Sequence, residues 1–188
     1  VTLRTPPVED LPRVATALAS FQADDNGPAQ LHPGDVGWNQ RDGAKSVGKA
    51  MRVWERDGEP IVIGMGDDDV IRLAVSPTVA SDEAVAAAIA ADLTGDGGLG
   101  AGVSSAEVRY GDALRRALQS RGWTEGEAWA CFTADLSRPI PEHGLRLEII
   151  DGTTEQTPDE AIVRDVVTAH LASWERSTFS TAKFHAMA

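Results

Sequence analysis

The chain has 188 residues, of which 42% are hydrophobic and 24% charged, a composition typical of a globular protein with a core of useful size. Its net charge of −12 argues against nucleic acid or an anionic membrane as a main partner, because binding to phosphates requires a basic stripe. Cys131 is the single cysteine, which excludes an internal disulfide, and no apolar stretch approaches the roughly 20 residues that span a bilayer. We therefore expect a cytoplasmic protein.

The first part of the sequence alternates between strand and helix patterns. In chain order we expect a strand at 2–5, a helix at 10–22 and a long loop at 23–48 with one helical turn at 35–40. A meander of three strands follows, at 49–56, 60–65 and 70–75. Such a meander predicts hairpin-linked, antiparallel strands.

A helix follows the meander, capped by Ser81 or Asp82 and running through Leu93, with acidic residues in its first turn as the helix dipole prefers. Next we expect a loop at 94–102, a strand at 106–110 and a helix at 112–121 that ends at Gly122. One or two final strands follow at 123–136, with a hairpin around 125–127. The order predicts an α+β fold (an α/β mixed sheet) with a mostly antiparallel sheet and helices on both faces.

The Pro-rich segment 137–144 predicts a hinge after a first domain of residues 1–136. Residues 145–188 repeat the opening order, with a strand at 145–150, a helix at 159–173 and a second helix starting near Thr181. We expect this region to be the truncated start of a second, similar unit. Because the sequence begins with Val1 and stops within a helical pattern, we also expect it to be part of a longer protein.

Two motifs within this order of strands and helices resemble motifs of a known protein family. GDALRRALQSRGW, at 111–123, resembles the helix pattern N-x-x-A-x-x-x-Y-x-x-x-G-F of the GNAT N-acetyltransferases, and VSP, at 75–77, resembles the V-x-P that ends their fourth strand. The segments at 31–38 and 176–187 resemble parts of tandem GNAT proteins, mainly actinobacterial. The chain thus resembles the N-terminal part of a tandem GNAT protein, and the resemblance implies transfer of an acetyl group from acetyl-CoA to an amine.

In that family the V-x-P strand end leads into R/Q-x-x-G-x-G/A, whose backbone N–H groups hold the coenzyme pyrophosphate. Here Ala80 stands for the Arg or Gln, and Ser81, Glu83 and Val85 stand for the three small residues. Glu83 brings a carboxylate toward the pyrophosphate, and like charges at ~4 Å cost about 1 kcal/mol in water and ~4 kcal/mol at an effective dielectric of 20. Val85 adds branched bulk. The sequence predicts that acetyl-CoA does not bind at 80–85.

The resemblance also implies a Tyr that protonates the departing thiolate, and in this register the position is Leu118, which has no proton to give. Gly111 replaces the usual Asn. We therefore expect neither catalytic nor cofactor-binding residues in residues 1–136, and a non-catalytic or acceptor-shaping role for them beside a second GNAT unit. Two alternatives stay open: a non-enzymatic binding or assembly module that retains the fold, and coenzyme binding by an unusual route.

Two segments are candidates for contact with a small-molecule or amine acceptor. Asp35 and Trp38 lie in the stretch that the resemblance assigns to the acceptor groove, although we prefer the simpler explanation that the Trp anchors a long loop to the sheet. The C-terminal arm carries an apolar stripe of helical period that includes Trp174 and continues to Phe179 and Phe184, and it resembles the acceptor-side wall of a second unit. We expect this arm to pack on the first domain, a second chain or a missing domain.

Other possible sites have simpler explanations. Gly95–Gly100 matches G-x-G-x-x-G, but a helix precedes it and a strand follows, the reverse of a dinucleotide site. The four histidines show no ligand spacing, so we expect no metal; His170 is predicted to pack on an apolar helix face. Asp67, Asp68 and Asp69 fit a solvated hairpin turn better than a cation site.

Overall fold

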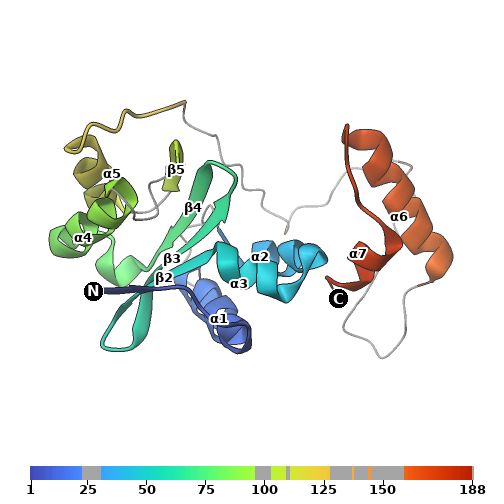
Figure 1. Cartoon of the computed structure of the whole chain (residues 1–188), viewed down its shortest axis with the longest axis horizontal. Coiled ribbons are helices and arrows are strands. Elements are labelled where there is room, and N and C mark those ends of the chain that lie inside the picture. Colours follow the sequence, from blue (N-terminus) through green and yellow to red (C-terminus); the bar gives the residue numbers. More distant parts are fainter. Residues whose placement is uncertain are drawn as a thin grey trace. The chain divides into compact units, whose positions relative to one another are not determined.

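The computed structural model describes residues 1–22, 31–95, 103–108, 111–127, 137, 144 and 159–187. The chain divides into two units, Val1–Glu127 and Ala128–Ala188 (Figure 1). The strand predicted at 145–150 and nearly all of the predicted hinge lie outside the described residues. The domain limits drawn from the sequence therefore remain predictions.

Five strands form one sheet in the first unit: β1 (Thr2–Arg4), β2 (Met51–Arg56), β3 (Glu59–Asp67), β4 (Val70–Val75) and β5 (Ser105–Val108). Their order in the sheet is the order in the chain, and β1 to β4 pair antiparallel while β4 and β5 pair parallel. The mixed, mostly antiparallel sheet of an α+β fold is confirmed.

Tight turns join the meander strands where the sequence predicts them. Asp57 and Gly58, with φ of 55° and 80°, connect β2 to β3, and Asp68, with φ of 54°, connects β3 to β4. Asp and Gly are among the residues that enter this left-handed region most readily. The turns set the register that places Val53 opposite Ile63.

Helices cover one face of the sheet from the segment between β1 and β2. The short 3-10 helix η1 (Val8–Asp10) leads into α1 (Leu11–Phe21), which is followed by α2 (Pro33–Asn39), the 3-10 helix η2 (Gln40–Asp42) and α3 (Ala44–Ala50). One core cluster lies between these helices and the sheet: Leu11, Val14, Leu18, Phe21, Leu31, Val36, Val47, Met51, Val53, Ile63, Met65 and Ala74.

The opposite face carries α4 (Glu83–Thr94) and α5 (Asp112–Gln119), with the 3-10 helix η3 (Pro77–Val79) between β4 and α4. Trp54 follows Val53 in β2 and points to this second face, as the alternation of a strand requires. Its indole Nε1 donates to Asp92 Oδ2 of α4 at 2.8 Å. The buried cluster here joins sheet and helices: Trp54, Ile61, Val62, Ile71, Leu73, Val75, Val79, Val85, Ala86, Ile89, Ala90, Leu93, Ala113, Leu114 and Leu118. Helices on both faces are confirmed.

The long loop predicted at 23–48 is partly wrong. The helical turn at 35–40 belongs to α2, but α3 was not expected, and β2 begins at Met51 rather than at residue 49. Gly37, Gly43 and Gly48 lower the helix propensity of this stretch. Burial of Val36 and Val47 against the sheet compensates for that low propensity. A second difference concerns residues 123–127, which have no regular structure where a strand and a hairpin were predicted; the rest of that prediction lies outside the described residues.

The second unit contains α6 (Glu160–Ser173) and α7 (Thr181–His185), which confirms the helices predicted from residue 159 and from Thr181. Asp159 caps α6 by accepting from Ala161 N, and Ser180 caps α7 by accepting from Lys183 N. None of the helices in the described parts of the chain has both the length and the apolar character needed to cross a membrane.

Candidate functional site

Residues 80–85 lead into α4, and the resemblance predicts a degenerate coenzyme turn there. β4 ends at Val75, and the Ser76 amide donates to Ile61 O at 2.9 Å, which ties the strand end to β3. Pro77 begins η3, as its fixed φ permits at a first helical position. Asp82 then takes the N-cap position of α4, one of the two positions that the sequence predicts.

The Asp82 carboxylate fills the N-terminus of this helix. Its Oδ1 accepts from the amides of Ala84 and Val85, each at 3.0 Å, and its Oδ2 accepts from Arg56 Nη2 at 2.6 Å. The hydrogen bond from Arg56 and then the one from Val85 lower the pKa of Asp82. The amide donors that make a helix N-terminus an anion site are thus occupied by the chain's own carboxylate, and Glu83 N–H is the remaining one in the first turn.

Glu83 lies beside this cap and joins α4 to α5. Its Oε1 accepts from Arg116 Nη2 at 2.6 Å, and this bond raises the pKa of Arg116. The carboxylate therefore lies at the helix start, where the sequence places it, but an arginine neutralises it. Val85 differs from the prediction, because its side chain is buried in the core beneath α4 and adds no bulk over the turn.

The helix α5 positions Leu118 in the core and not in a cleft. Leu118 is buried, and the amide of Trp123 donates to Leu118 O at 3.2 Å while the amide of Gly122 donates to Gln119 O at 3.0 Å. With φ of +89° at Gly122, these two bonds form a Schellman end, as the sequence predicts. Gly111 precedes α5 with φ of +119°, and a Cβ there would meet Val75 Cγ2 at 3.2 Å, so Gly at this position has a backbone reason.

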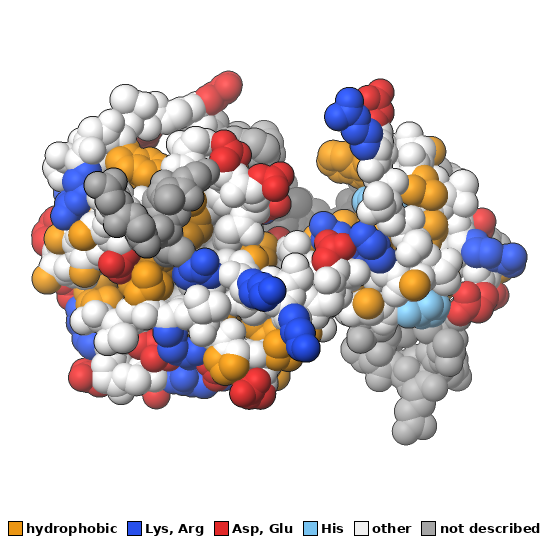
Figure 2. Space-filling view, in the orientation of Figure 1, with side chains coloured by type: hydrophobic (Ala, Val, Ile, Leu, Met, Phe, Trp, Pro, Cys, Tyr) orange, Lys and Arg blue, Asp and Glu red, His pale blue; other side chains and the backbone are white. Residues whose placement is uncertain are grey.

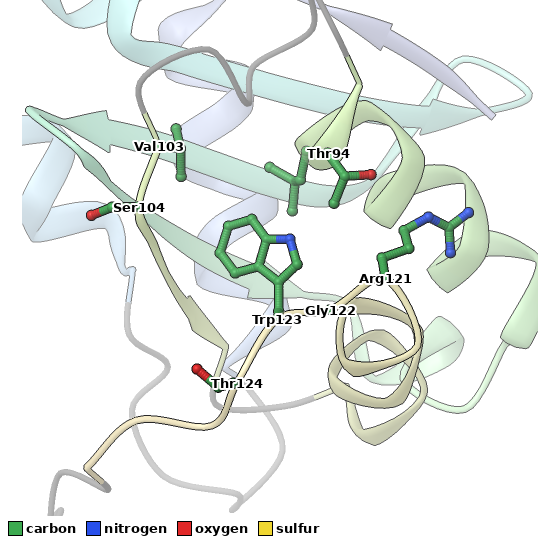
Figure 3. Close-up of a pocket in the computed structure, with 8 residues that line it drawn as sticks. Thr94, Val103, Ser104, Arg121, Gly122, Trp123 and Thr124 are labelled. Carbon is green, nitrogen blue, oxygen red and sulfur yellow. The ribbon is translucent and has the colours of Figure 1, made fainter.

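A hollow of about 480 Å³ opens at the other end of α4 (Figure 3). The Trp123 ring lies in it, close to the C-terminal end of α4 and to the residues just before β5. The lining residues from the described part of the chain carry no carboxylate: Leu93, Thr94, Val103, Ser104, Arg121, Gly122, Trp123 and Thr124. Arg121 contacts the carbonyl oxygens of Ala117 and Ala87 at 3.5 and 3.3 Å, so it bridges α5 to α4. The Gly-Trp pair that follows α5 is the one local feature of the sequence that indicates this hollow.

The acceptor-side candidates of the first unit are Asp35 and Trp38, both on α2. Asp35 Oδ2 accepts from His32 N at 2.8 Å, and His32 Nδ1 accepts from Gly34 N at 2.9 Å, so these residues cap α2 reciprocally. Trp38 is 41% exposed, and the Arg41 guanidinium lies 4.5 Å from its ring centroid. The predicted anchor is therefore not a buried one. The capping role of His32 was missed because histidine is an uncommon N-cap.

The candidates of the second unit lie on and after α6. Trp174 is 65% exposed, whereas Phe179 is buried with its ring centroid 4.4 Å from that of His170. Phe184, on α7, is half-buried and meets the His185 ring edge-on at 5.7 Å. His170 was predicted to pack on an apolar helix face, and its ring contacts those of Trp174 and Phe179. These residues and those on α2 belong to separate units.

The minor candidates behave as turn residues where the structure describes them. Asp67 forms an ion pair with Arg72 at 2.8 Å, and Asp69 accepts from the hydroxyl of Ser104, which confirms the hairpin explanation. Among the described residues no group of His, Cys, Asp or Glu could hold a metal ion. Gly95 directly follows α4, and the rest of the 95–100 motif lies outside the described residues.

Comparison with known proteins adds no relative to this picture, since no protein-family model, no curated protein and no solved structure matches the chain significantly.

Proposed function

We propose that the chain is the N-terminal part of a GNAT-type N-acetyltransferase, and that residues 1–136 form a non-catalytic or acceptor-shaping half. In the complete enzyme a deprotonated amine attacks the thioester of acetyl-CoA directly, with the coenzyme held by a second unit. The proposal rests on the motifs at 75–77 and 111–123, together with the sheet and helix order found around them. A cytoplasmic location is part of the proposal and rests on the single cysteine.

One observation supports the non-catalytic role of the first unit. The Asp82 carboxylate takes the amides of Ala84 and Val85, and the Glu83 carboxylate beside it is paired with Arg116. A coenzyme diphosphate would have to displace a covalently attached anion from the helix N-terminus. Leu118, in the register of the proton donor, offers no acid from its position in the core.

Calorimetric titration of the chain with acetyl-CoA tests this role. We expect no saturable heat at millimolar coenzyme, with CoA and ADP as matched titrants that carry the same diphosphate. Stoichiometric binding of the coenzyme would refute the proposal for this half. If Asp82→Asn strengthened that binding and Arg56→Gln weakened it, the diphosphate would lie at the α4 turn.

The acetyl-transfer part needs its own experiment, on the complete gene product. We expect acetyl transfer from acetyl-CoA to at least one member of an amine panel, detected by release of free thiol. The Glu83→Gln variant of that product should transfer at the same rate, because the first unit holds no coenzyme. Absence of transfer to every amine would refute the enzyme assignment.

A second candidate function, an assembly module that retains the fold without catalysis, is favoured by the apolar face of α6. Leu171 is 46% exposed and Trp174, directly after α6, is 65% exposed, and neighbouring exposed apolar side chains can form an interaction surface. Sedimentation of the chain distinguishes this candidate. Concentration-dependent association that Leu171→Ser and Trp174→Ser abolish is expected of a module, and a monomer at all concentrations contradicts it.

A further inference from the structure

Ion pairing among the cations of the first unit is uneven. Most of its described Lys and Arg side chains lie within 4.0 Å of a carboxylate: Arg4, Arg13, Arg41, Arg56, Arg72, Arg115 and Arg116. Within the described residues, four cations form no such pair, and three of them are close neighbours: Lys45, Lys49 and Arg52. The fourth is Arg121. In a chain with 29 acids and 17 bases, three adjacent cations without a carboxylate are a local exception.

These three side chains form one surface, which we call the basic stripe (Lys45, Lys49 and Arg52). Lys45 and Lys49 are exposed and four residues apart on α3, so they lie on the same side of the helix with a rise of about 6 Å between them. Figure 2 shows Lys and Arg side chains over this part of the first unit.

Arg52 extends the basic stripe from the end of α3. Its Nη1 donates to Lys49 O at 2.6 Å and to Met51 O at 2.8 Å. The other guanidinium nitrogens make no hydrogen bond to a described residue. Partial burial lowers the pKa of Arg52, and no carboxylate counteracts that effect. A half-buried cation held only by backbone carbonyls gains most from an external anion.

An exposed aromatic side chain lies on α2, which precedes the basic stripe in the chain. Trp38 of α2 is 41% exposed, and Arg41 stacks over its ring at 4.5 Å while pairing with Asp42 at 3.4 Å. Exposed Trp and Arg side chains are common in protein–protein contacts, because they combine apolar area with hydrogen bonding. The segment from α2 to the start of β2 thus combines unpaired positive charge with a flat apolar ring.

We propose that the basic stripe is a docking surface for an acidic peptide segment of a partner protein. Alternate residues of an extended segment are about 6.6 Å apart, close to the ~6 Å between Lys45 and Lys49. Carboxylates on every second residue therefore meet successive lysines, and a third reaches Arg52. This surface does not depend on acetyl transfer by the chain.

Charge favours a short acidic peptide over nucleic acid as the partner. Three cations neutralise only about three phosphates, and the remainder of a chain with net charge −12 repels a long polyanion. A peptide with three carboxylates interacts mainly with the cations of the basic stripe, because salt screens more distant charges over a Debye length of about 8 Å at physiological salt.

Fluorescence anisotropy with a labelled peptide of alternating glutamate and serine tests the proposal. The control peptide carries glutamine for glutamate. We expect saturable binding of the acidic peptide at low salt, weakening as salt rises, and no binding of the glutamine peptide. Equal binding of both peptides, or none of the acidic peptide at millimolar protein, refutes the docking surface.

Two variants with the same change in net charge locate the site. Lys45→Gln with Lys49→Gln lowers the charge by two within the basic stripe, and Arg121→Glu lowers it by two elsewhere on the first unit. We expect at least a tenfold loss of affinity for the first and less than a twofold loss for the second. Equal losses would show that affinity depends only on the net charge of the chain and would overturn the proposal. Tighter binding of an oligonucleotide of the same length than of the peptide would also overturn it.

Discussion

The start of α4 and the basic stripe on α3 are two charged regions of the first unit with opposite organisation. At the α4 start, Asp82 is bound by Arg56 and two amides, and Glu83 by Arg116. On α3, Lys45 and Lys49 face solvent without a described carboxylate within ion-pair distance. The first region satisfies its charges internally, and the second leaves them for something outside the chain.

This difference separates charges that serve the fold from charges that do not. The partners of Asp82 and Glu83 come from β2 and α5, so their ion pairs join elements distant in the chain. The two lysines of the stripe form no ion pair with a described residue, and Arg52 bonds only to the backbone of Lys49 and Met51, so removal of the lysine charges should cost the fold little. Stability measurements on the two regions therefore test the comparison directly.

The largest effect is expected beneath α4, where Trp54 supports the helix that carries the paired charges. Trp54→Ala removes a fully buried side chain and its hydrogen bond to Asp92, and should lower the free energy of unfolding by about 3–5 kcal/mol. Urea denaturation measures the loss. The matched control is Trp38→Ala, which removes a ring that is 41% exposed together with its stacking on Arg41, and this should cost about 1 kcal/mol or less. Similar losses for both would contradict the described core.

The core and the elements around it could be predicted from the sequence because local patterns of hydrophobic residues mark them. The short apolar runs at 60–65 and 70–75, rich in Val and Ile, and the Ala-rich helix through Leu93 are local patterns, and the structure confirms them. The partners of the α4 turn were not accessible. Arg56 is 26 residues from Asp82 and Arg116 is 33 residues from Glu83, and nothing local encodes such a pairing.

The α2–α3 segment was missed for a different reason, which is weak local propensity. Gly37 and Gly43 argue for a loop, whereas the His32 cap and the burial of Val47 stabilise helices there. The basic stripe was correspondingly invisible, because Lys45 and Lys49 share a side only once α3 is known to be a helix.

An intermediate effect is expected on the acid side of the stability profile. Arg56 holds the pKa of Asp82 below its ordinary 3.8, and Arg4 holds the pKa of Glu55 below its ordinary 4.5. A carboxyl with a lowered folded pKa stabilises the protein above its unfolded pKa, and the contribution is lost as pH falls through the folded value. The melting temperature should therefore fall below about pH 4.5.

Asp82→Asn isolates the part due to the α4 start, because asparagine keeps the cap and loses the charge. We expect a shallower fall on the acid side, whereas Asp82→Ala should also lower the melting temperature by a few degrees at pH 7 through loss of the cap. Thermal scans from pH 7 to pH 3 measure both effects. An acid-side slope in Asp82→Asn as steep as that of the unmodified chain would contradict the Arg56–Asp82 pair.

The smallest effect is expected in the basic stripe. Lys45→Gln with Lys49→Gln removes two exposed charges from α3 and leaves no buried group unpaired, and glutamine has a helix propensity close to that of lysine. The free energy of unfolding should change by less than about 0.5 kcal/mol in urea denaturation, because surface substitutions away from specific contacts rarely do more. Relief of repulsion between the two lysines favours a slight gain over a loss. A clear loss of stability would mean that the stripe has an internal partner after all, and the same double variant would then no longer separate docking from folding.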